Sequence, residues 1–239
     1  MKHNLTWMTG RPIAHRGLHN TANNILENTL PACRAAMQMG YNIEVDLHPS
    51  STGEPIVFHD ATLERLAGDP RNVRDLSPAE LGNISLENSD ENIATFEQLL
   101  QLVDGKTGIV LEMKGVAGED EGFVAAIADC LKNYHGPVAI MSFYHWLLKD
   151  ARQFAPSLPL GLTAMGDDER YQQHETIAAQ CDFDFLSYKW KDLPCKFATQ
   201  FRQTGKPLIC WTVKSPAQQP KALRHCDQIT FEGFKPASN

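Results

Sequence analysis

The chain has 239 residues, of which 42% are hydrophobic and 21% are charged, as is typical of a globular protein with a full hydrophobic core. Its formal net charge of −7 argues against non-specific binding to nucleic acid. The N-terminal sequence lacks the apolar core of a signal peptide and no segment is long enough to span a bilayer, so we expect one cytoplasmic domain over residues 1–239 without stable membrane insertion.

The first predicted elements are a short strand and a helix. Residues 12–17 are apolar at first and end in a His-Arg-Gly sequence. Either Asn28 or Thr29 is suited to cap a helix that runs through Met39, with a proline in its first turn and a glycine as its stop.

The next predicted strand, residues 42–48, has an unusual distribution of acidic residues. Its apolar side chains alternate with Glu44 and Asp46 at period two, so both carboxylates lie on one face. Two carboxylates in this arrangement are close enough to share a cation. The same pattern also fits a solvent-exposed strand face, although acidic residues are uncommon in the middle of strands.

A less regular segment follows this strand. After a turn, residues 55–58 form a short apolar run that ends at His59 and Asp60. Residues 61–90 have mixed polarity, with a helix start at Ser77. We interpret approximately 47–92 as an insertion after the second strand.

From residue 95 onward, helices and strands alternate with short connections. Helices are expected over 95–103, 121–133, 145–154, 168–179, 195–204 and 216–224, and strands over 108–115, 137–143, 158–164, 183–189, 206–213 and 228–232. Near-continuously apolar strands in this alternation are typical of a parallel sheet covered by helices. With 55–58 counted outside the core there are eight strands, which predicts an α/β TIM (β/α)₈ barrel. A doubly wound open sheet is the alternative, but the first βα turn lacks its Gly-rich phosphate fingerprint.

In such a barrel, side chains at the carboxyl ends of the strands face the active site. The polar and aromatic residues at these expected ends are His15, Arg16, Glu44, Asp46, Glu112, Lys114, Ser142 and Trp211. Three carboxylates without a cysteine favour a hard cation such as Mg²⁺ or Ca²⁺ over zinc. Such a metal suits phosphoryl chemistry, and two flanking histidines can act as general base and general acid near neutral pH. The alternatives are a structural Glu112–Lys114 ion pair and a core role for Trp211.

These residues occur in motifs that resemble the glycerophosphodiester phosphodiesterase family. The motifs are AHRG at 14–17, ENTL at 27–30, IEVDL at 43–47, PIVFHDATLERL at 55–66, LEMKG at 111–115, SF at 142–143 and WTV at 211–213. They follow the family's order and spacing from residue 12 to about 213. The resemblance implies a TIM barrel with a small insertion after the second strand. It also implies hydrolysis of glycerophosphodiesters to an alcohol and sn-glycerol 3-phosphate.

The resemblance also implies a role for each matching residue. His15 and His59 match the catalytic acid/base pair, which we interpret as base and acid respectively. The ligands of a divalent cation, which is Mg²⁺, Ca²⁺ or Mn²⁺, correspond to Glu44, Asp46 and Glu112. Arg16 and Lys114 match positions that bind the phosphate of the substrate. Glu27 matches a position that supports the first histidine and the glycerol end of the substrate. Trp211 matches an apolar wall against the substrate.

The chain departs from the family pattern near its C-terminus. The family usually has Thr-Asp followed by Pro after the last strand, whereas this chain has Phe231, Glu232 and Gly233 after Thr230. Lys214 stands where asparagine is common. These departures concern the rim of the barrel, and therefore the leaving alcohol more than the reaction.

Several functions are compatible with parts of this pattern. The leading hypothesis is a phosphodiesterase whose partner is a small glycerophosphodiester, with a homodimer left open. An enzyme of the lysophospholipase D type would act on a lipid and would need an apolar rim. A binding protein would not need the chemical groups, and a carbon–carbon lyase or isomerase would not need His59.

Overall fold

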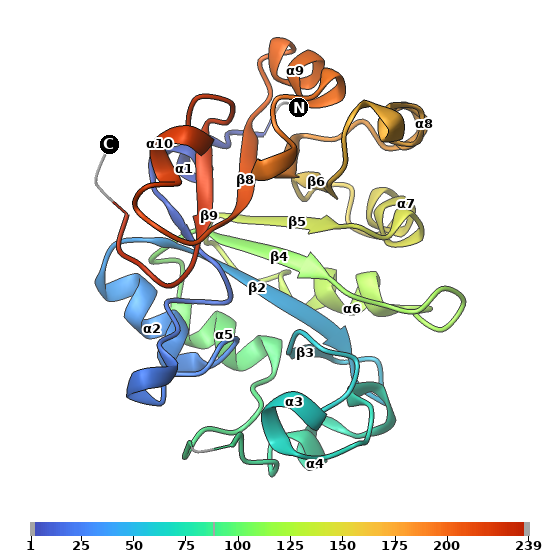
Figure 1. Cartoon of the computed structure of the whole chain (residues 1–239). Coiled ribbons are helices and arrows are strands. Elements are labelled where there is room, and N and C mark those ends of the chain that lie inside the picture. The colour runs from blue at the N-terminus through green and yellow to red at the C-terminus, as the bar shows by residue number, and fades with distance from the viewer. Residues whose placement is uncertain (1–2, 88, 237–239) are drawn as a thin grey trace.

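Eight apolar segments form parallel strands that close into a barrel in the computed structural model, which describes residues 3–87 and 89–236 (Figure 1). The order around the barrel is β1-β9-β8-β7-β6-β5-β4-β2, and pairing of β1 with β2 closes it. The strands are β1 Ile13–Ala14, β2 Asn42–Pro49, β4 Ile109–Met113, β5 Val138–Ser142, β6 Leu160–Ala164, β7 Phe185–Lys189, β8 Leu208–Val213 and β9 Gln228–Phe231. The predicted TIM barrel is confirmed.

Helices on the outside of the barrel connect successive strands. They are α2 Leu30–Gln38, α5 Phe96–Val103, α6 Phe123–Cys130, α7 His145–Phe154, α8 Tyr171–Cys181, α9 Lys196–Gln203 and α10 Gln219–Ala222. Thr29 caps α2, because its hydroxyl accepts a hydrogen bond from the Ala32 amide. In the described part of the chain, no helix is long and apolar enough to cross a membrane.

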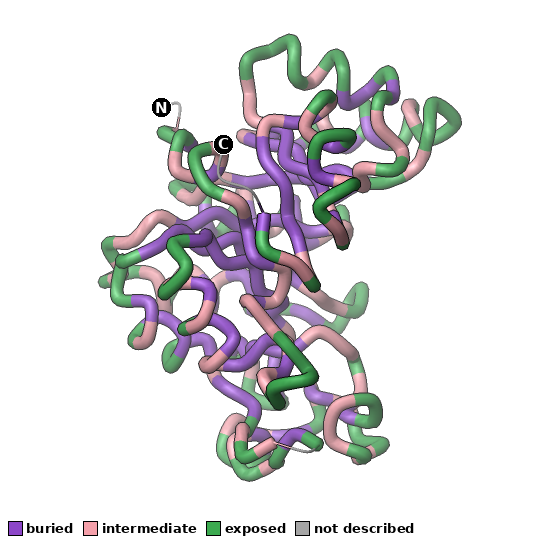
Figure 2. The backbone as a smooth tube through the Cα atoms, turned by 60° about the vertical axis from the view of Figure 1, so that its left-hand side comes forward, coloured by how far each residue is buried: buried purple, intermediate pink, exposed green. Residues whose placement is uncertain are grey.

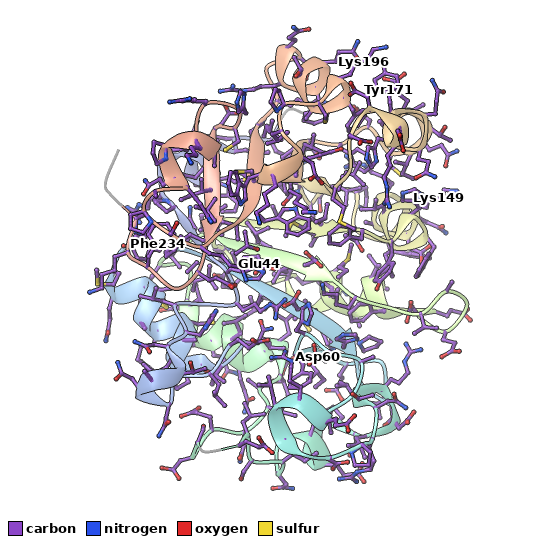
Figure 3. The ribbon with its side chains drawn as sticks, viewed as in Figure 1. Glu44, Asp60, Lys149, Tyr171, Lys196 and Phe234 are labelled. Carbon is purple, nitrogen blue, oxygen red and sulfur yellow. The ribbon has the colours of Figure 1, made fainter. Side chains whose placement is uncertain are left out.

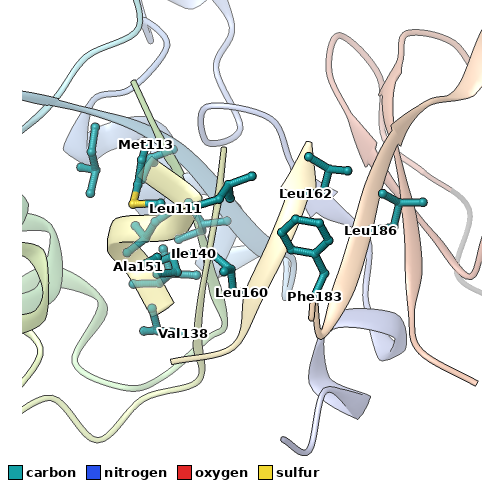
Figure 4. Close-up of a cluster of buried hydrophobic side chains, with 14 of the residues drawn as sticks. Leu111, Met113, Val138, Ile140, Ala151, Leu160, Leu162, Phe183 and Leu186 are labelled. Atoms are coloured by element: carbon teal, nitrogen blue, oxygen red, sulfur yellow. The ribbon is translucent and has the colours of Figure 1, made fainter. Parts of the chain in front are cut away.

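The outward faces of the strands supply the main hydrophobic core. Ile43, Val45 and Leu47 of β2 are fully buried in this core, as the period-two alternation predicts. Similar outward residues from the other strands pack against the helices (Figure 4), and buried backbone runs through the centre of the molecule (Figure 2). The opposite strand faces, which carry Glu44 and Asp46, therefore point into the barrel.

The inside of the barrel near the start of the strands is closed by a helix that we did not predict. Leu5 and Met8 of the N-terminal segment pack with inward-facing residues of the strands, including Ile13 and Val110. Met8 is fully buried on α1, Thr6–Gly10. A helix of five residues without a side-chain cap has too little periodicity to be recognised from sequence.

The segment between β2 and α5 is an insertion with its own small core. It begins with β3, Pro55–Val57, which pairs antiparallel with β2. It also contains α3, Glu64–Ala67, and α4, Pro78–Leu81, which are seen together at one side of the barrel in Figure 1. The apolar residues of this core are separate from the main cluster. The predicted insertion after the second strand is thus confirmed.

The burial of Met8 gives a direct test of the helix that closes the barrel. Met8→Ala should lower the free energy of unfolding by about 2–5 kcal/mol, because it removes buried apolar volume. Met39→Ala is the matched control, since the Met39 side chain is 45% exposed, and we expect a change within about 0.5 kcal/mol. Urea denaturation of both variants measures the difference. Equal effects would show that α1 does not stabilise the barrel.

Candidate active site

A cavity of about 350 Å³ lies at the carboxyl ends of the barrel strands. Residues from β1, β2, β4, β8 and the insertion meet in its wall. Its wall contains most of the residues that the sequence placed at the strand ends or assigned to the site, namely His15, Arg16, Glu44, Asp46, His59, Glu112, Lys114 and Trp211. The exceptions are Ser142, which is fully buried and donates to the Met113 carbonyl, and Glu27, which binds Arg16 from outside the wall.

The register of two neighbouring strands brings three carboxylates together. Asp46 of β2 is the direct partner of Glu112 of β4, and Glu44 lies two residues earlier on the same face of β2. One oxygen from each of the three carboxylates lies within 4.8 Å of the others, and all three residues are buried. Parallel pairing therefore creates a compact cluster of negative charge inside the barrel.

Cations and hydrogen-bond donors surround this cluster. Lys114 contacts Glu112 and lies 3.1 Å from Asp46 Oδ1, while Arg16 Nε lies 3.3 Å from Asp46 Oδ2. Asn28 Nδ2 donates to Asp46 Oδ2 at 2.9 Å. Burial opposes ionisation of Asp46, but Lys114 and the other nearby cations hold its pKa below the usual range.

Glu44 is the less compensated member of the cluster. Burial and the adjacent charge of Asp46 raise its pKa well above the usual range of a carboxyl. Three oxygen ligands with an excess of negative charge fit a hard divalent cation, so Glu44, Asp46 and Glu112 are suited to hold one.

The turn after β1 is shaped by the contacts of its backbone. The Arg16 amide donates to Glu44 Oε2 at 2.9 Å, and Arg16 adopts a left-handed φ of 55°. Gly17 follows with φ 76°, and a Cβ atom at this position would lie 2.8 Å from Ala32. The glycine of the His-Arg-Gly sequence is therefore required by both backbone conformation and space.

His15 is held by the carboxylate of Glu232, which directly follows β9. Its Nδ1 lies 2.6 Å from Glu232 Oε2, and the other carboxylate oxygen of Glu232 lies 2.5 Å from Lys214 Nζ. Burial lowers the pKa of His15, but Glu232 and Glu44 raise it, and the result lies above the ordinary value. The hydrogen bond from His15 also keeps Glu232 ionised, because it holds the pKa of Glu232 to about 2. An ionised Glu232 accepts from Nδ1–H, so Nε2 of His15 remains for chemistry.

His59 reaches the same cavity from the insertion. Its Nδ1 lies 2.6 Å from Asp60 Oδ1. Its backbone carbonyl accepts a hydrogen bond of 2.9 Å from His48 Nε2. The two predicted histidines therefore approach from different elements, and each has a carboxylate at Nδ1.

Glu27 and Trp211 occupy different positions relative to the cavity. Glu27 is outside the cavity wall and binds Arg16 Nη1 at 2.7 Å, so its contacts in this structure support an arginine. Trp211 is half-buried and lies in the wall, where its ring packs edge-on against Phe143 with centroids 5.4 Å apart. This position is compatible with the role of an apolar wall against the substrate, which stays a prediction.

The sequence analysis missed several residues that complete the site. Asn28 was considered only as a cap, and Glu232 only as a departure from a pattern. Asp60 and Arg65 lay inside a quoted motif without an assigned role. The acidic residue after the last strand was the one available signal for a partner of His15.

The comparisons with known proteins agree with this geometry. Residues 15–230 match the model of the glycerophosphoryl diester phosphodiesterase family. The chain belongs to this family. It is 32% identical over 162 residues to a glycerophosphodiester phosphodiesterase of Caldanaerobacter subterraneus subsp. tengcongensis, an alignment that covers 63% of this chain and 65% of that protein.

Solved structures of other phosphodiesterases share the fold. The complex of an Oleispira antarctica phosphodiesterase with the product sn-glycerol-3-phosphate has a TM-score of 0.79 and 23% identity, covering 92% of this chain and 91% of that one. A glycerophosphodiester phosphodiesterase from Thermotoga maritima has a TM-score of 0.74 and 24% identity, covering 92% of each chain.

The contact between His15 and Glu232 predicts a shift in pH dependence. Glu232→Gln keeps a hydrogen-bond acceptor but removes the charge that raises the pKa of His15. The pKa of His15 should fall, so the neutral ring that a general base needs persists to lower pH. We expect the ascending limb of kcat/KM against pH to move to lower pH.

A matched variant separates this effect from a general change in charge. Glu97→Gln removes an exposed carboxylate on α5, away from the cavity, and should leave the profile unchanged. If Glu232→Gln and Glu97→Gln gave the same profile as the wild type, Glu232 would not control His15.

Proposed function

We propose that this chain is a metal-dependent glycerophosphodiester phosphodiesterase that releases an alcohol and sn-glycerol 3-phosphate. The observation that carries the proposal is one cavity in which three buried carboxylates, two carboxylate-paired histidines, Arg16 and Lys114 meet. Carboxylates alone would suit many metal enzymes. The two histidines with two cations are what phosphodiester cleavage specifically needs.

The proposed chemistry follows from the position of each group. Glu44, Asp46 and Glu112 would hold a divalent cation, which would supply positive charge to offset the charge that develops on the phosphate oxygens. Arg16 and Lys114 bind the phosphate and orient it. His15 accepts a proton at Nε2 from the attacking oxygen as the new P–O bond forms. His59 donates a proton from Nε2 to the departing oxygen as the old P–O bond breaks.

The rim of the cavity favours a small polar substrate over a lipid. Lys189, Lys191 and Lys214 line it together with Trp190 and Trp211. A lysophospholipid would need a continuous apolar path for its acyl chain. Charged ammonium groups among the aromatic rings interrupt such a path. Cytoplasmic location and homodimer formation remain predictions from the sequence.

Metal dependence can be tested by activity and, independently, by binding. We expect a chelator to abolish activity, and Mg²⁺, Mn²⁺ or Ca²⁺ to restore it. Calorimetric titration of the chelator-treated protein should show one divalent site, which Glu112→Gln weakens strongly because a ligand is lost. Asp104→Asn is the control, since the Asp104 side chain is 72% exposed. Full activity after exhaustive chelation would contradict the metal-dependent mechanism.

The roles of the two histidines can be separated by the leaving group. We expect His15→Ala and His59→Ala each to lower kcat by roughly 10²–10⁴-fold on an alkyl diester. A nitrophenyl diester needs little protonation of its leaving group, so it should rescue His59→Ala but not His15→Ala. His135→Ala, at an exposed histidine, is the control. Rescue of His15→Ala alone would reverse the two roles, and equal rescue would exclude a dedicated acid.

A further inference from the structure

Arg65 contacts two carboxylates that come from different parts of the chain. Its Nε donates to Asp60 Oδ2 at 2.5 Å. Its Nη2 and Nη1 donate to Oε1 and Oε2 of Glu27 at 2.6 and 3.1 Å. One planar guanidinium on α3 of the insertion thus binds a carboxylate of the insertion and a carboxylate of the loop before α2. A lysine ammonium cannot reproduce this fork.

Arg65 lies behind the cavity rather than in it. It is absent from the cavity wall, and its side chain is 47% exposed. The two carboxylates that it binds are less accessible, with side chains 15% exposed for Glu27 and 24% for Asp60. Arg65 therefore binds both carboxylates without lining the cavity itself.

The orientation of the His59 ring depends on Asp60. The hydrogen bond from His48 fixes the carbonyl of His59 but leaves its side-chain torsions free. The ring is held at Nδ1 by Asp60 Oδ1, and Asp60 in turn is held at Oδ2 by Arg65. Burial opposes ionisation of Asp60, but hydrogen bonds from Arg65 and His59 lower its pKa, so Asp60 stays a carboxylate acceptor.

The insertion contacts the barrel through Arg65 as well as through the pairing of β3 with β2. It has a hydrophobic core of its own, and Figure 3 places Asp60 on the insertion side of β2, with Glu44 near the barrel centre. Glu27 belongs to the barrel side, because it also accepts from Arg16 Nη1 at 2.7 Å. Arg65 spans the two sides through Asp60 and Glu27.

We propose that Arg65 is a positioning residue, which ties Asp60 to Glu27 and thereby fixes the His59 ring relative to the barrel. The inference rests on the proposed function, because it places His59 in that reaction. Arg16 has its own contacts with Glu27 and Asp46, and we expect these to persist when Arg65 is removed. Loss of Arg65 therefore acts through His59. A small misplacement of a reacting group lowers the rate steeply.

The first test compares two arginines of the insertion. Arg65→Gln should lower kcat for an alkyl diester on the order of 10–100-fold, with little change in KM. Arg65→Lys should be intermediate, since an ammonium keeps the charge but not the fork. Arg71→Gln is the matched control, because Arg71 is 53% exposed and its ion pair is with Asp69. Thermal unfolding of all three variants shows whether the fold is retained.

The second test asks whether Arg65 acts through His59. In the His59→Ala background, Arg65→Gln should cost far less than it does in the wild type, because no ring remains to be positioned. Equal fold-losses in both backgrounds would overturn the proposal. So would a wild-type kcat in Arg65→Gln when Arg71→Gln is also unaffected.

A third measurement does not depend on activity. Ring ¹⁵N resonances of His59, recorded where the ring carries both protons, should show one hydrogen-bonded Nδ1–H in the wild type and in Arg71→Gln, and a mixture of Nδ1 environments in Arg65→Gln. Unchanged His59 resonances in Arg65→Gln would overturn the positioning role. If the wild type cleaved no diester, the proposed function would fail, and this spectrum would still decide whether Arg65 orders His59.

Discussion

Three carboxylates buried side by side inside the barrel impose the constraint on which the site depends. Ionised groups in this position repel one another and lose hydration, so each needs a nearby cation or donor. The pairing of Asp46 with Glu112 across β2 and β4 prevents the carboxylates from moving apart. Arg16 and Lys114 partly balance their charge, and burial together with the charge of Asp46 raises the pKa of Glu44. Three carboxylates against two cations leave residual negative charge, which makes the cluster costly and also suited to a divalent ion.

The strands can carry this acidic cluster on their inward faces because their outward faces are apolar and buried. The outward residues of β2 are fully buried against helices, and α1 fills the barrel at the opposite end from the cavity. Apolar burial on the outer face and at the barrel floor stabilises the strands that carry the acidic residues. The insertion adds a separate core and carries His59, whose carbonyl is also held by His48 of β2.

Local patterns predicted the barrel and most of the cavity wall, because strand alternation and helix caps are properties of neighbouring residues. Glu44 and Asp46 share a face for this reason, and Thr29 and Thr95 cap the expected helices. The register that places Glu112 beside Asp46 is not local; the barrel prediction brought their strand ends to one face, and the family resemblance gave them a shared role as ligands. Glu232 could not be assigned to His15 because the two are separated by 217 positions in the chain. Arg65 was missed because its two carboxylates meet only after the insertion folds against the barrel.

Each histidine is the first member of a series of contacts that runs from the histidine to a carboxylate and then to a cation. His15 contacts Glu232, whose second oxygen binds Lys214, and His59 contacts Asp60, whose second oxygen binds Arg65. The cations differ in their further contacts. Lys214 is 63% exposed and its ammonium ends the first chain, whereas Arg65 continues to Glu27 on the barrel. This difference follows from where each histidine is attached. His15 is fixed by the barrel backbone, since its amide donates to Phe231 of β9, so its carboxylate needs only a counter-charge. The backbone at His59 is held by β2, through Phe58 and through His48, but its side chain projects from the insertion, so the cation behind its carboxylate also ties that side chain to Glu27.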